Sequence, residues 1–216
     1  MRAQYPVATM VKRAVDVVLS VWALALLWPV LAGLALAVRL VDGRPVLFAQ
    51  RRSGLHGEPF MLRKFRTMST ESEDPTTDAH RITRLGAFLR ATSLDELPTL
   101  LNVVVGDMSL VGPRPLPERY LDRYTPEQRR RLETRPGITG LAQVEGRNLL
   151  SWEDRFALDV EYVDTCSLKG DVELVMRTIR SVLRREGVEA DGAVTMPEFW
   201  GREGDRELEG PRSDEV

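Results

Sequence analysis

A long uncharged apolar run near the N-terminus most constrains what this chain can fold into. Residues 17–38 are 22 consecutive positions without a charged side chain. As an α-helix rising about 1.5 Å per residue, the run would extend about 33 Å, enough to cross a bilayer core of roughly 30 Å. It is longer than the core of a secretory signal peptide, which has about 7–15 apolar residues. The sequence therefore predicts a membrane-associated protein.

Two arrangements in the membrane stay open for this run. Both flanks are basic, with Lys12 and Arg13 before it and Arg39 and Arg44 after it, so neither end is suited to translocation. Pro29 lies near the middle, where it removes a backbone hydrogen bond and clashes with the preceding turn. A helix broken at Pro29 would dip into one leaflet and return, leaving both basic ends in the cytoplasm. We favour this re-entrant form over a straight span, although spanning helices also tolerate proline.

The remaining residues have the composition of a folded domain. The chain is 43% apolar and 29% charged, and its net charge of −2 does not indicate a nucleic-acid partner. Its one cysteine, Cys166, excludes an internal disulfide and a cysteine-based zinc site.

The pattern of apolar and turn residues predicts an α+β fold that is mostly helical. Residues 45–50 and 60–66 are β-prone and flank a glycine-containing turn, which predicts a small β-hairpin. Helices are expected over 81–90, after Ser93, Thr125 and Ser151, and over 171–185. The last helix carries an apolar stripe, which is interpreted as core packing or, alternatively, as a surface lying on the membrane. Its members are Val172, Val175, Ile179, Val182 and Leu183.

Two adjacent carboxylates are the candidates for chemistry. Ser93 and Glu96 are spaced as a capping box, so Asp95 and Glu96 are expected at the positive end of a helix. Ionised Asp95 would be a competent nucleophile toward phosphorus, and Glu96 could ligate Mg²⁺. On spacing alone, both residues could equally be simple helix caps.

Several basic residues occupy positions suited to phosphate binding. Arg114 lies between Pro113 and Pro115, which restrict its backbone, and Lys64 and Arg66 alternate on the second predicted strand. A guanidinium presented rigidly loses little entropy when it binds a phosphate bidentately. Each of these residues, taken singly, could also be an ordinary exposed side chain.

Taken together, the motifs resemble the small monotopic bacterial phosphoglycosyl transferases, also called the bacterial sugar transferase family. The similarity extends over about residues 10 to 185 in one order and spacing. The matching segments are 12–16 (KRAVD), 64–68 (KFRTM), 93–98 (SLDELP), 106–115 (GDMSLVGPRP), 135–140 (RPGITG), 143–148 (QVEGRN) and 162–164 (YVD).

The resemblance implies a specific reaction. Asp95 would attack the sugar-bearing phosphate of a UDP-sugar and expel UMP. A polyprenyl phosphate, expected to be undecaprenyl phosphate, would then take the phospho-sugar in a ping-pong sequence. Glu96 would help to hold Mg²⁺, and Arg114 would contact phosphate. By the same resemblance, further phosphate-binding residues are expected at Lys64, Arg90 and Arg147, and the strand pattern adds Arg66 to these candidates.

The resemblance also implies an organisation and a location. Residues 1–40 would form the re-entrant anchor, 41–187 a compact catalytic domain with interfacial amphipathic helices, and 188–216 a C-terminal extension. The protein would lie on the cytoplasmic face of the bacterial inner membrane, in contact with its lipid, and a homodimer is allowed. Residues 195–199 are similar to the tails of members that use N-acetylated amino sugars, or could be an uninvolved surface patch. A nucleotide-sugar hydrolase and a non-catalytic membrane-tethered scaffold remain as alternatives.

Overall fold

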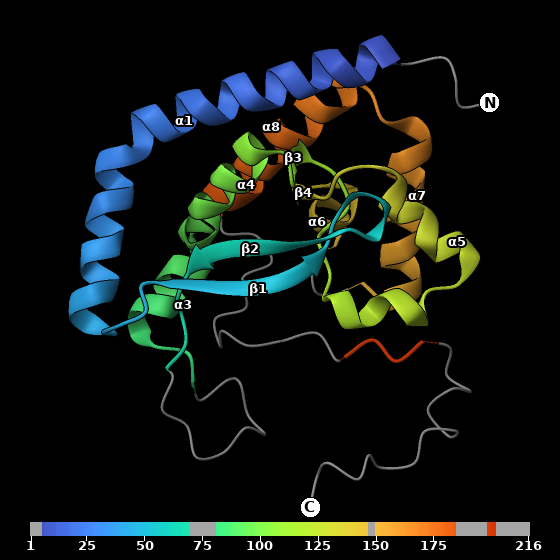
Figure 1. The fold of residues 1–216 in the computed structure, drawn as a ribbon. Coiled ribbons are helices and arrows are strands. Elements are labelled where there is room, and N and C mark those ends of the chain that lie inside the picture. Colours follow the sequence, from blue (N-terminus) through green and yellow to red (C-terminus); the bar gives the residue numbers. More distant parts are fainter. Residues whose placement is uncertain (1–5, 70–80, 147–149, 185–197, 202–216) are drawn as a thin grey trace, which may run out of the picture.

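The computed structural model describes residues 6–69, 81–146, 150–184 and 198–201. Its α-helices and β-strands follow one another in a mostly helical α+β arrangement, as predicted (Figure 1). In chain order they are α1 (Pro6–Val41), β1 (Leu47–Ser53), β2 (Pro59–Phe65), α3 (Arg84–Ala91), α4 (Leu100–Val105), β3 (Ser109–Val111), α5 (Pro126–Arg129), β4 (Gly137–Thr139), α6 (Leu141–Glu145), α7 (Trp152–Thr165) and α8 (Leu168–Arg184).

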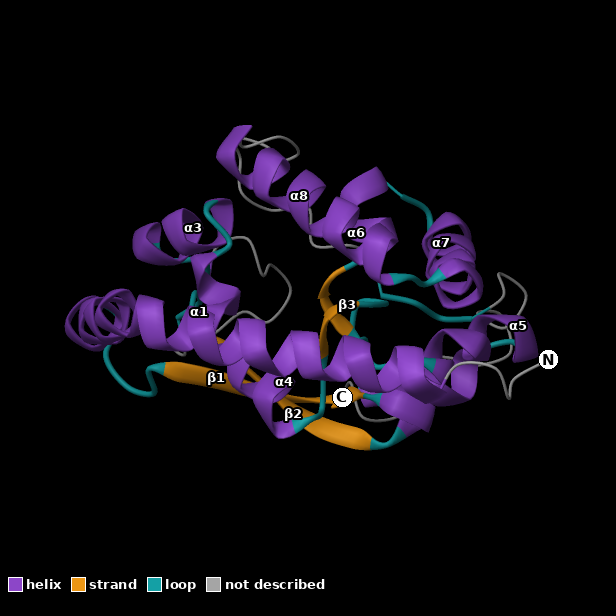
Figure 2. Ribbon diagram, turned by 90° about the horizontal axis from the view of Figure 1, so that it is seen from above, coloured by secondary structure: helices purple, strands orange, loops and turns teal. Residues whose placement is uncertain are grey.

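The apolar run forms one long helix with two arms. Helix α1 contains Pro29, and Figure 1 shows the helix bending between an arm that lies along the body and an arm that turns down beside α3. Seen from above, the second arm appears end-on, while the first passes over β3, between the hairpin with α4 and the group α6 to α8 (Figure 2). Thr9–Val41 is long and apolar enough to cross a membrane, and most of this segment is not buried by the protein.

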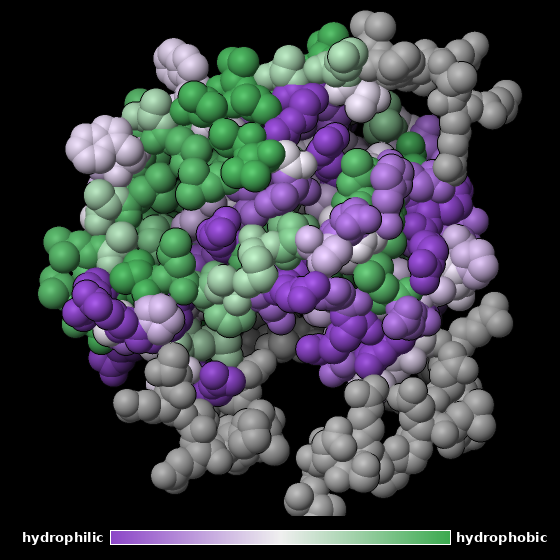
Figure 3. Space-filling model, viewed as in Figure 1, coloured by the Kyte–Doolittle hydropathy of each residue, from purple (hydrophilic) through white to green (hydrophobic). Residues whose placement is uncertain are grey.

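Apolar side chains gather on one side of the molecule, over α1 and the neighbouring α4 (Figure 3). Large exposed side chains of α1 and α4 contribute to the apolar surface. They include Leu19, Trp22, Leu26, Leu36, Leu101 and Val105. A surface of this kind marks a membrane or protein contact in a folded protein.

The predicted hairpin is confirmed. β1 and β2 pair antiparallel, with Phe48 opposite Lys64 and Arg52 opposite Phe60. Because side chains alternate between the faces of a strand, Arg52 and Lys64 lie on the same face. That face is turned toward the body, since Phe60 is buried beneath it with Val103 and Met108.

A second, very short sheet holds the segment around Arg114. β3 and β4 pair in parallel, with Ser109 opposite Gly137 and Val111 opposite Thr139. The two backbone segments approach so closely that a Cβ on Gly137 would lie 2.1 Å from the backbone nitrogen of Gly112. Only glycine fits this close approach, so Gly137 fixes the position of the backbone just before the Pro113–Pro115 segment. This pairing was not predicted from the sequence.

Core packing does not explain the apolar stripe of α8. Val172 and Ile179 are 64% and 48% exposed, whereas Leu174 is buried and Val175 packs beside it. The core-packing interpretation is therefore wrong for Val172 and Ile179, because α8 packs against β3 and α6 with a different side. The exposed side remains available to a membrane surface.

Part of the C-terminal extension returns to the body. Phe199 is buried in an aromatic cluster with Tyr120, Tyr124 and Phe156. Glu198 accepts hydrogen bonds from two arginines of the 118–123 segment. The interpretation of this stretch as an uninvolved surface patch is therefore wrong for Phe199. Residues 195–197 and most of the extension lie outside the described residues.

Candidate active site

The two carboxylates lie in a 3₁₀ helix, Leu94–Thr99, and α4 begins only at Leu100. Ser93 has a left-handed φ of 56°, and its side chain caps no backbone N–H. The predicted capping box is therefore wrong. Pro98 gives a physical reason, because in an α-helix its ring would clash with the carbonyl of Leu94, four residues earlier.

Asp95 is buried and accepts no hydrogen bond from the described residues. Asp95 is 5% exposed, and no residue in the described part of the chain donates a hydrogen bond to its carboxylate. Burial, and then the neighbouring charge of Glu96, raise the pKa of Asp95 to about 6. Desolvation therefore opposes the ionisation that the helix end was expected to favour. A carboxylate without a partner and with a raised pKa is more nucleophilic than one held in an ion pair.

Glu96, in contrast, is held in place. Its Oε1 accepts a hydrogen bond from Arg114 Nη2 at 2.8 Å. Burial alone would raise the pKa of Glu96, but the charge and hydrogen bond of Arg114 outweigh it and the net shift is downward. Glu96 is therefore the fixed anion of the pair and Asp95 the free one.

Lys64 and Arg90 provide positive charge on the side of Asp95. The charges of Lys64 and Arg90 both lower the pKa of Asp95, and Lys64 acts more strongly. Lys64 projects from β2 toward the body and also lies over the Phe48 ring, 5.7 Å from its centroid. Arg90, in the last turn of α3, donates from Nε to Thr67 Oγ1 at 2.9 Å. The structure thus brings two of the predicted phosphate-binding residues close to Asp95.

The segment carrying Arg114 is fixed at several points. The carbonyl of Pro113 accepts from the Gly137 N–H at 2.9 Å, and that of Arg114 accepts from Arg131 Nη2 at 2.7 Å. Arg131 is itself ion-paired with Asp159, and both side chains are 1% exposed. The Arg114 guanidinium is thereby presented to Glu96 from a rigid backbone, as its position between two prolines predicted.

One predicted residue, Arg66, lies elsewhere. Arg66 is buried at the end of α1, where it donates to the carbonyls of Arg44 and Asp42. It therefore joins the anchor to the hairpin. Arg147 lies outside the described residues.

Two further arginines beside the site were not singled out from the sequence. Arg52 lines a pocket with Lys64, Glu96 and Arg114, and burial followed by the Arg114 charge lowers its pKa to about 10. Arg155 is buried, and its pKa is lowered to about 10 by burial and then by the same Arg114 charge. The period-2 pattern of β1 places Arg52 on the Lys64 face, so that signal was available. Nothing local marked Arg155, because α7 places it by tertiary packing.

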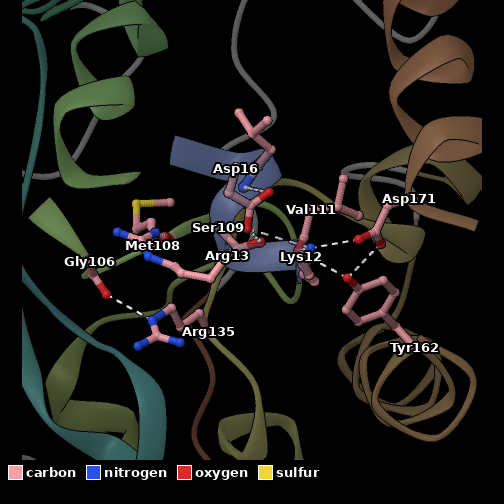
Figure 4. Close-up of polar contacts among 11 residues, drawn as sticks. Lys12, Arg13, Asp16, Gly106, Met108, Ser109, Val111, Arg135, Tyr162 and Asp171 are labelled. Carbon is pink, nitrogen blue, oxygen red and sulfur yellow. Dashed lines mark hydrogen bonds and ion pairs between the residues drawn. The ribbon is translucent and has the colours of Figure 1, made fainter. Parts of the chain in front are cut away.

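The first arm of α1 is joined to the body by a polar cluster (Figure 4). Lys12 Nζ lies 2.6 Å from Asp171 Oδ2, and Tyr162 donates to the other oxygen of Asp171 at 2.8 Å. One helical turn later, buried Asp16 accepts from Ser109 Oγ at 2.6 Å. Since Ser109 begins β3, the anchor is directly connected to the strand that leads into Arg114.

Few groups near the site could bind a metal. Within residues 6–69, 81–146, 150–184 and 198–201, no three His, Cys, Asp or Glu side chains are grouped as metal ligands. Asp95 and Glu96 are the adjacent acidic pair. Mg²⁺ commonly takes one or two protein carboxylates and completes its shell with water and substrate phosphates. The residues present fit that pattern.

Comparison with known proteins identifies the family. The bacterial sugar transferase family matches residues 7–185. The chain is 47% identical over 193 residues to the uncharacterized sugar transferase EpsL of Bacillus subtilis, with 88% of this chain and 96% of that protein covered. It is 44% identical over 185 residues to the UDP-glucose:undecaprenyl-phosphate glucose-1-phosphate transferase of Caulobacter vibrioides, covering 80% and 69%. It is 39% identical over 196 residues to the undecaprenyl-phosphate galactose phosphotransferase of Salmonella typhimurium, covering 82% of this chain and 41% of the other.

The chain therefore belongs to the bacterial sugar transferase family and is a phosphoglycosyl transferase. The scaffold alternative is set aside by this membership.

Proposed function

We propose that this enzyme transfers a phospho-sugar from a UDP-sugar to undecaprenyl phosphate and releases UMP, through a covalent intermediate on Asp95. The relatives named for this kind of transfer support the substrates. The observation that carries the mechanism is the contrast between the two carboxylates. Glu96 is ion-paired with Arg114, whereas Asp95 lies beside Lys64 and Arg90 and accepts no hydrogen bond from any residue that the structure describes.

In the first half-reaction, an oxygen of Asp95 forms a bond to the sugar-bearing phosphorus. The bond from that phosphorus to the bridging oxygen breaks, and its electron pair stays on the UMP phosphate. Lys64 and Arg90 stabilise the negative charge on the phosphoryl oxygens while the bond to Asp95 forms and the bond to UMP breaks. No proton is needed, because the negative charge of Asp95 reappears on UMP.

In the second half-reaction, undecaprenyl phosphate attacks the same phosphorus and Asp95 leaves as a carboxylate. The phosphate oxygen of the acceptor is already ionised near neutral pH, so a general base is not required. Hydrolysis differs only in having water as the acceptor, and buried Asp95 favours exclusion of water from the intermediate.

A divalent cation fits this site. Mg²⁺ held by Glu96, with Asp95 or substrate oxygens beside it, would supply further neutralisation of the diphosphate. The sugar is proposed to be an N-acetylated amino sugar only on the similarity of residues 195–199.

The way in which α1 meets the body supports a re-entrant anchor. Lys12 in the first arm is ion-paired with Asp171, and Val38 in the second arm is buried with Phe65 and Leu89. Both ends of the apolar helix thus contact one folded unit. A straight span would place those ends on opposite sides of the membrane, which favours a helix that enters and leaves one face. We place that face in the cytoplasm, where nucleotide-sugars are found.

A topology experiment tests the anchor. Tags at residue 1 and at residue 216 should both be cytoplasmic in protease-protection experiments on oriented inner-membrane vesicles. A periplasmic residue 1 with a cytoplasmic residue 216 would exclude the re-entrant form.

A substrate panel tests the reaction. Purified enzyme in nanodiscs is given UDP-glucose, UDP-galactose, UDP-GlcNAc and UDP-GalNAc with and without undecaprenyl phosphate, and UMP is measured. We expect multiple-turnover UMP release with at least one donor, dependent on the acceptor and lost in Asp95→Asn. Acceptor-independent release of free sugar phosphate would indicate the hydrolase instead.

A further inference from the structure

The pocket beside Glu96 gathers positive charge. Arg52, Lys64 and Arg114 line it with Glu96. Burial lowers the pKa of both Arg52 and Lys64, and repulsion from Arg114 contributes in each case. Cations that are desolvated and crowded together are stabilised by a bound anion.

Arg52 is oriented with donors to spare. Its Nη1 donates to the Pro115 carbonyl at 3.2 Å and its Nη2 to Gln50 Oε1 at 2.6 Å, whereas its buried Nε has no hydrogen-bond partner. A guanidinium carries five N–H donors, so these two bonds fix the group and leave further donors for a ligand. Such a fork is suited to two oxygens of one phosphate.

Arg52 and Lys64 lie at different points along the hairpin. Lys64 is paired with Phe48, four residues before Arg52 on the same face, which corresponds to about 13 Å along the strand. Arg52 donates to the carbonyl of Pro115, next to Arg114. Arg52 is therefore at the Pro115 end of the pocket, away from Lys64.

In-line displacement at phosphorus puts the attacking and leaving oxygens on opposite sides. With Asp95 attacking beside Lys64, the leaving phosphate falls toward the other end of the pocket, where Arg52 lies next to the Arg114 segment. We propose that Arg52 binds the phosphate of the departing UMP in the pocket that it shares with Arg114. This proposal rests on the proposed function.

The role assigned to Arg52 matches where charge appears in the reaction. As the bond to the bridging oxygen breaks, the UMP phosphate gains one negative charge and Asp95 loses one. Arg52 meets that new charge, so it acts in the first half-reaction. UMP has left before undecaprenyl phosphate reacts, so Arg52 has no ligand to stabilise in the second.

The two half-reactions can be measured separately. Full-length enzyme in nanodiscs is mixed with UDP-sugar without acceptor, and the burst of UMP is followed. Enzyme carrying the phospho-sugar is then freed of nucleotide and mixed with undecaprenyl phosphate. The inhibition constant of UMP is obtained from product inhibition. For Arg52→Met we expect this constant to rise about tenfold or more and the burst to slow about tenfold to a hundredfold, while transfer to the acceptor changes less than about twofold.

Matched variants separate binding from scaffolding. Arg51→Met removes the same charge one residue earlier, from an exposed side chain paired with Glu118, and should leave all three quantities unchanged. Arg52→Lys keeps the charge without the fork and should give intermediate values, which also provides the readout if Arg52→Met does not fold.

Two results would overturn the proposal. One is UMP inhibition in Arg52→Met equal to that of the wild type. The other is an equal loss in both half-reactions, as expected if Arg52 only supports Pro115. Failure of the proposed function is distinct, since the wild type would then show no UMP release dependent on Asp95.

Discussion

Arg114 Nη2 lies 2.8 Å from Glu96 Oε1, and this ion pair distinguishes Glu96 from the adjacent carboxylate of Asp95. The paired carboxylate has a lowered pKa, and its unpaired neighbour Asp95 has a raised one. Two groups of the same chemistry are thus given different roles by their surroundings.

The ion pair should be energetically coupled in catalysis. Arg114→Met and Glu96→Gln should each reduce kcat/KM about tenfold to a hundredfold, because each leaves a partly buried partner without its counter-charge. The double variant should lose much less than the product of the two effects. Steady-state kinetics of the four proteins complete the cycle, and simple multiplication of the losses would show that the pair does not act as a unit.

The pH dependence of the first half-reaction should report Asp95. The ionised form is the nucleophile, and its pKa is about 6, so kcat/KM for the UDP-sugar should rise through pH 6 and level off above it. Lys64→Met removes the cation that most lowers this pKa and should move the rise to higher pH. A profile that is flat between pH 5 and 8 in both proteins would contradict this assignment.

The same shift predicts a pH-dependent effect on stability. The pKa of Asp95 is raised from 3.8 to about 6, so the folded state binds its proton more tightly and loses stability as pH rises from about 4 to above 6. Asp95→Asn avoids this cost and should be more stable than the wild type at pH 7.5, by up to about 3 kcal/mol. The difference should shrink toward pH 4. Thermal unfolding in detergent at several pH values checks this, and an Asn variant less stable at pH 7.5 would be the opposite result.

The buried pair beneath Arg114 should matter for both stability and activity. Asp159→Asn leaves Arg131 with a buried uncompensated charge and should cost about 3–5 kcal/mol in the free energy of unfolding. Because Arg131 also holds the Arg114 carbonyl, UMP release should slow as well. Asp164→Asn is the control, since it breaks the exposed pair with Arg130 and should change stability by less than about 1 kcal/mol. Similar losses in the two variants would show that burial of the Asp159 pair is not decisive.

Local patterns in the sequence predicted those parts of the molecule that local physics determines. The apolar run up to Val38 became α1, the alternation around Lys64 became β2, and the prolines around Arg114 fixed its backbone. The capping box at Ser93 was wrong, because Pro98 and tertiary packing favoured a 3₁₀ helix over the local cap.

Contacts between distant segments were beyond such patterns. The parallel pairing of β3 with β4 depends on the close approach of Gly112 and Gly137. Phe199 entered the core from a tail with no periodicity. Arg155 lies near Arg114 because of the position of α7. Arg66 lies away from the site because it binds backbone carbonyls at the end of α1. Each of these outcomes depends on a partner far away in the sequence.

Direct detection of the intermediate tests the central claim most directly. Enzyme mixed with its UDP-sugar in the absence of acceptor is quenched, and its peptides are examined by mass spectrometry. We predict that the peptide containing Asp95 gains the mass of one phospho-sugar, that Asp95→Asn does not, and that undecaprenyl phosphate removes the added mass. Multiple-turnover transfer by an enzyme that never carries this mass on Asp95, or an adduct on another residue, would contradict the account.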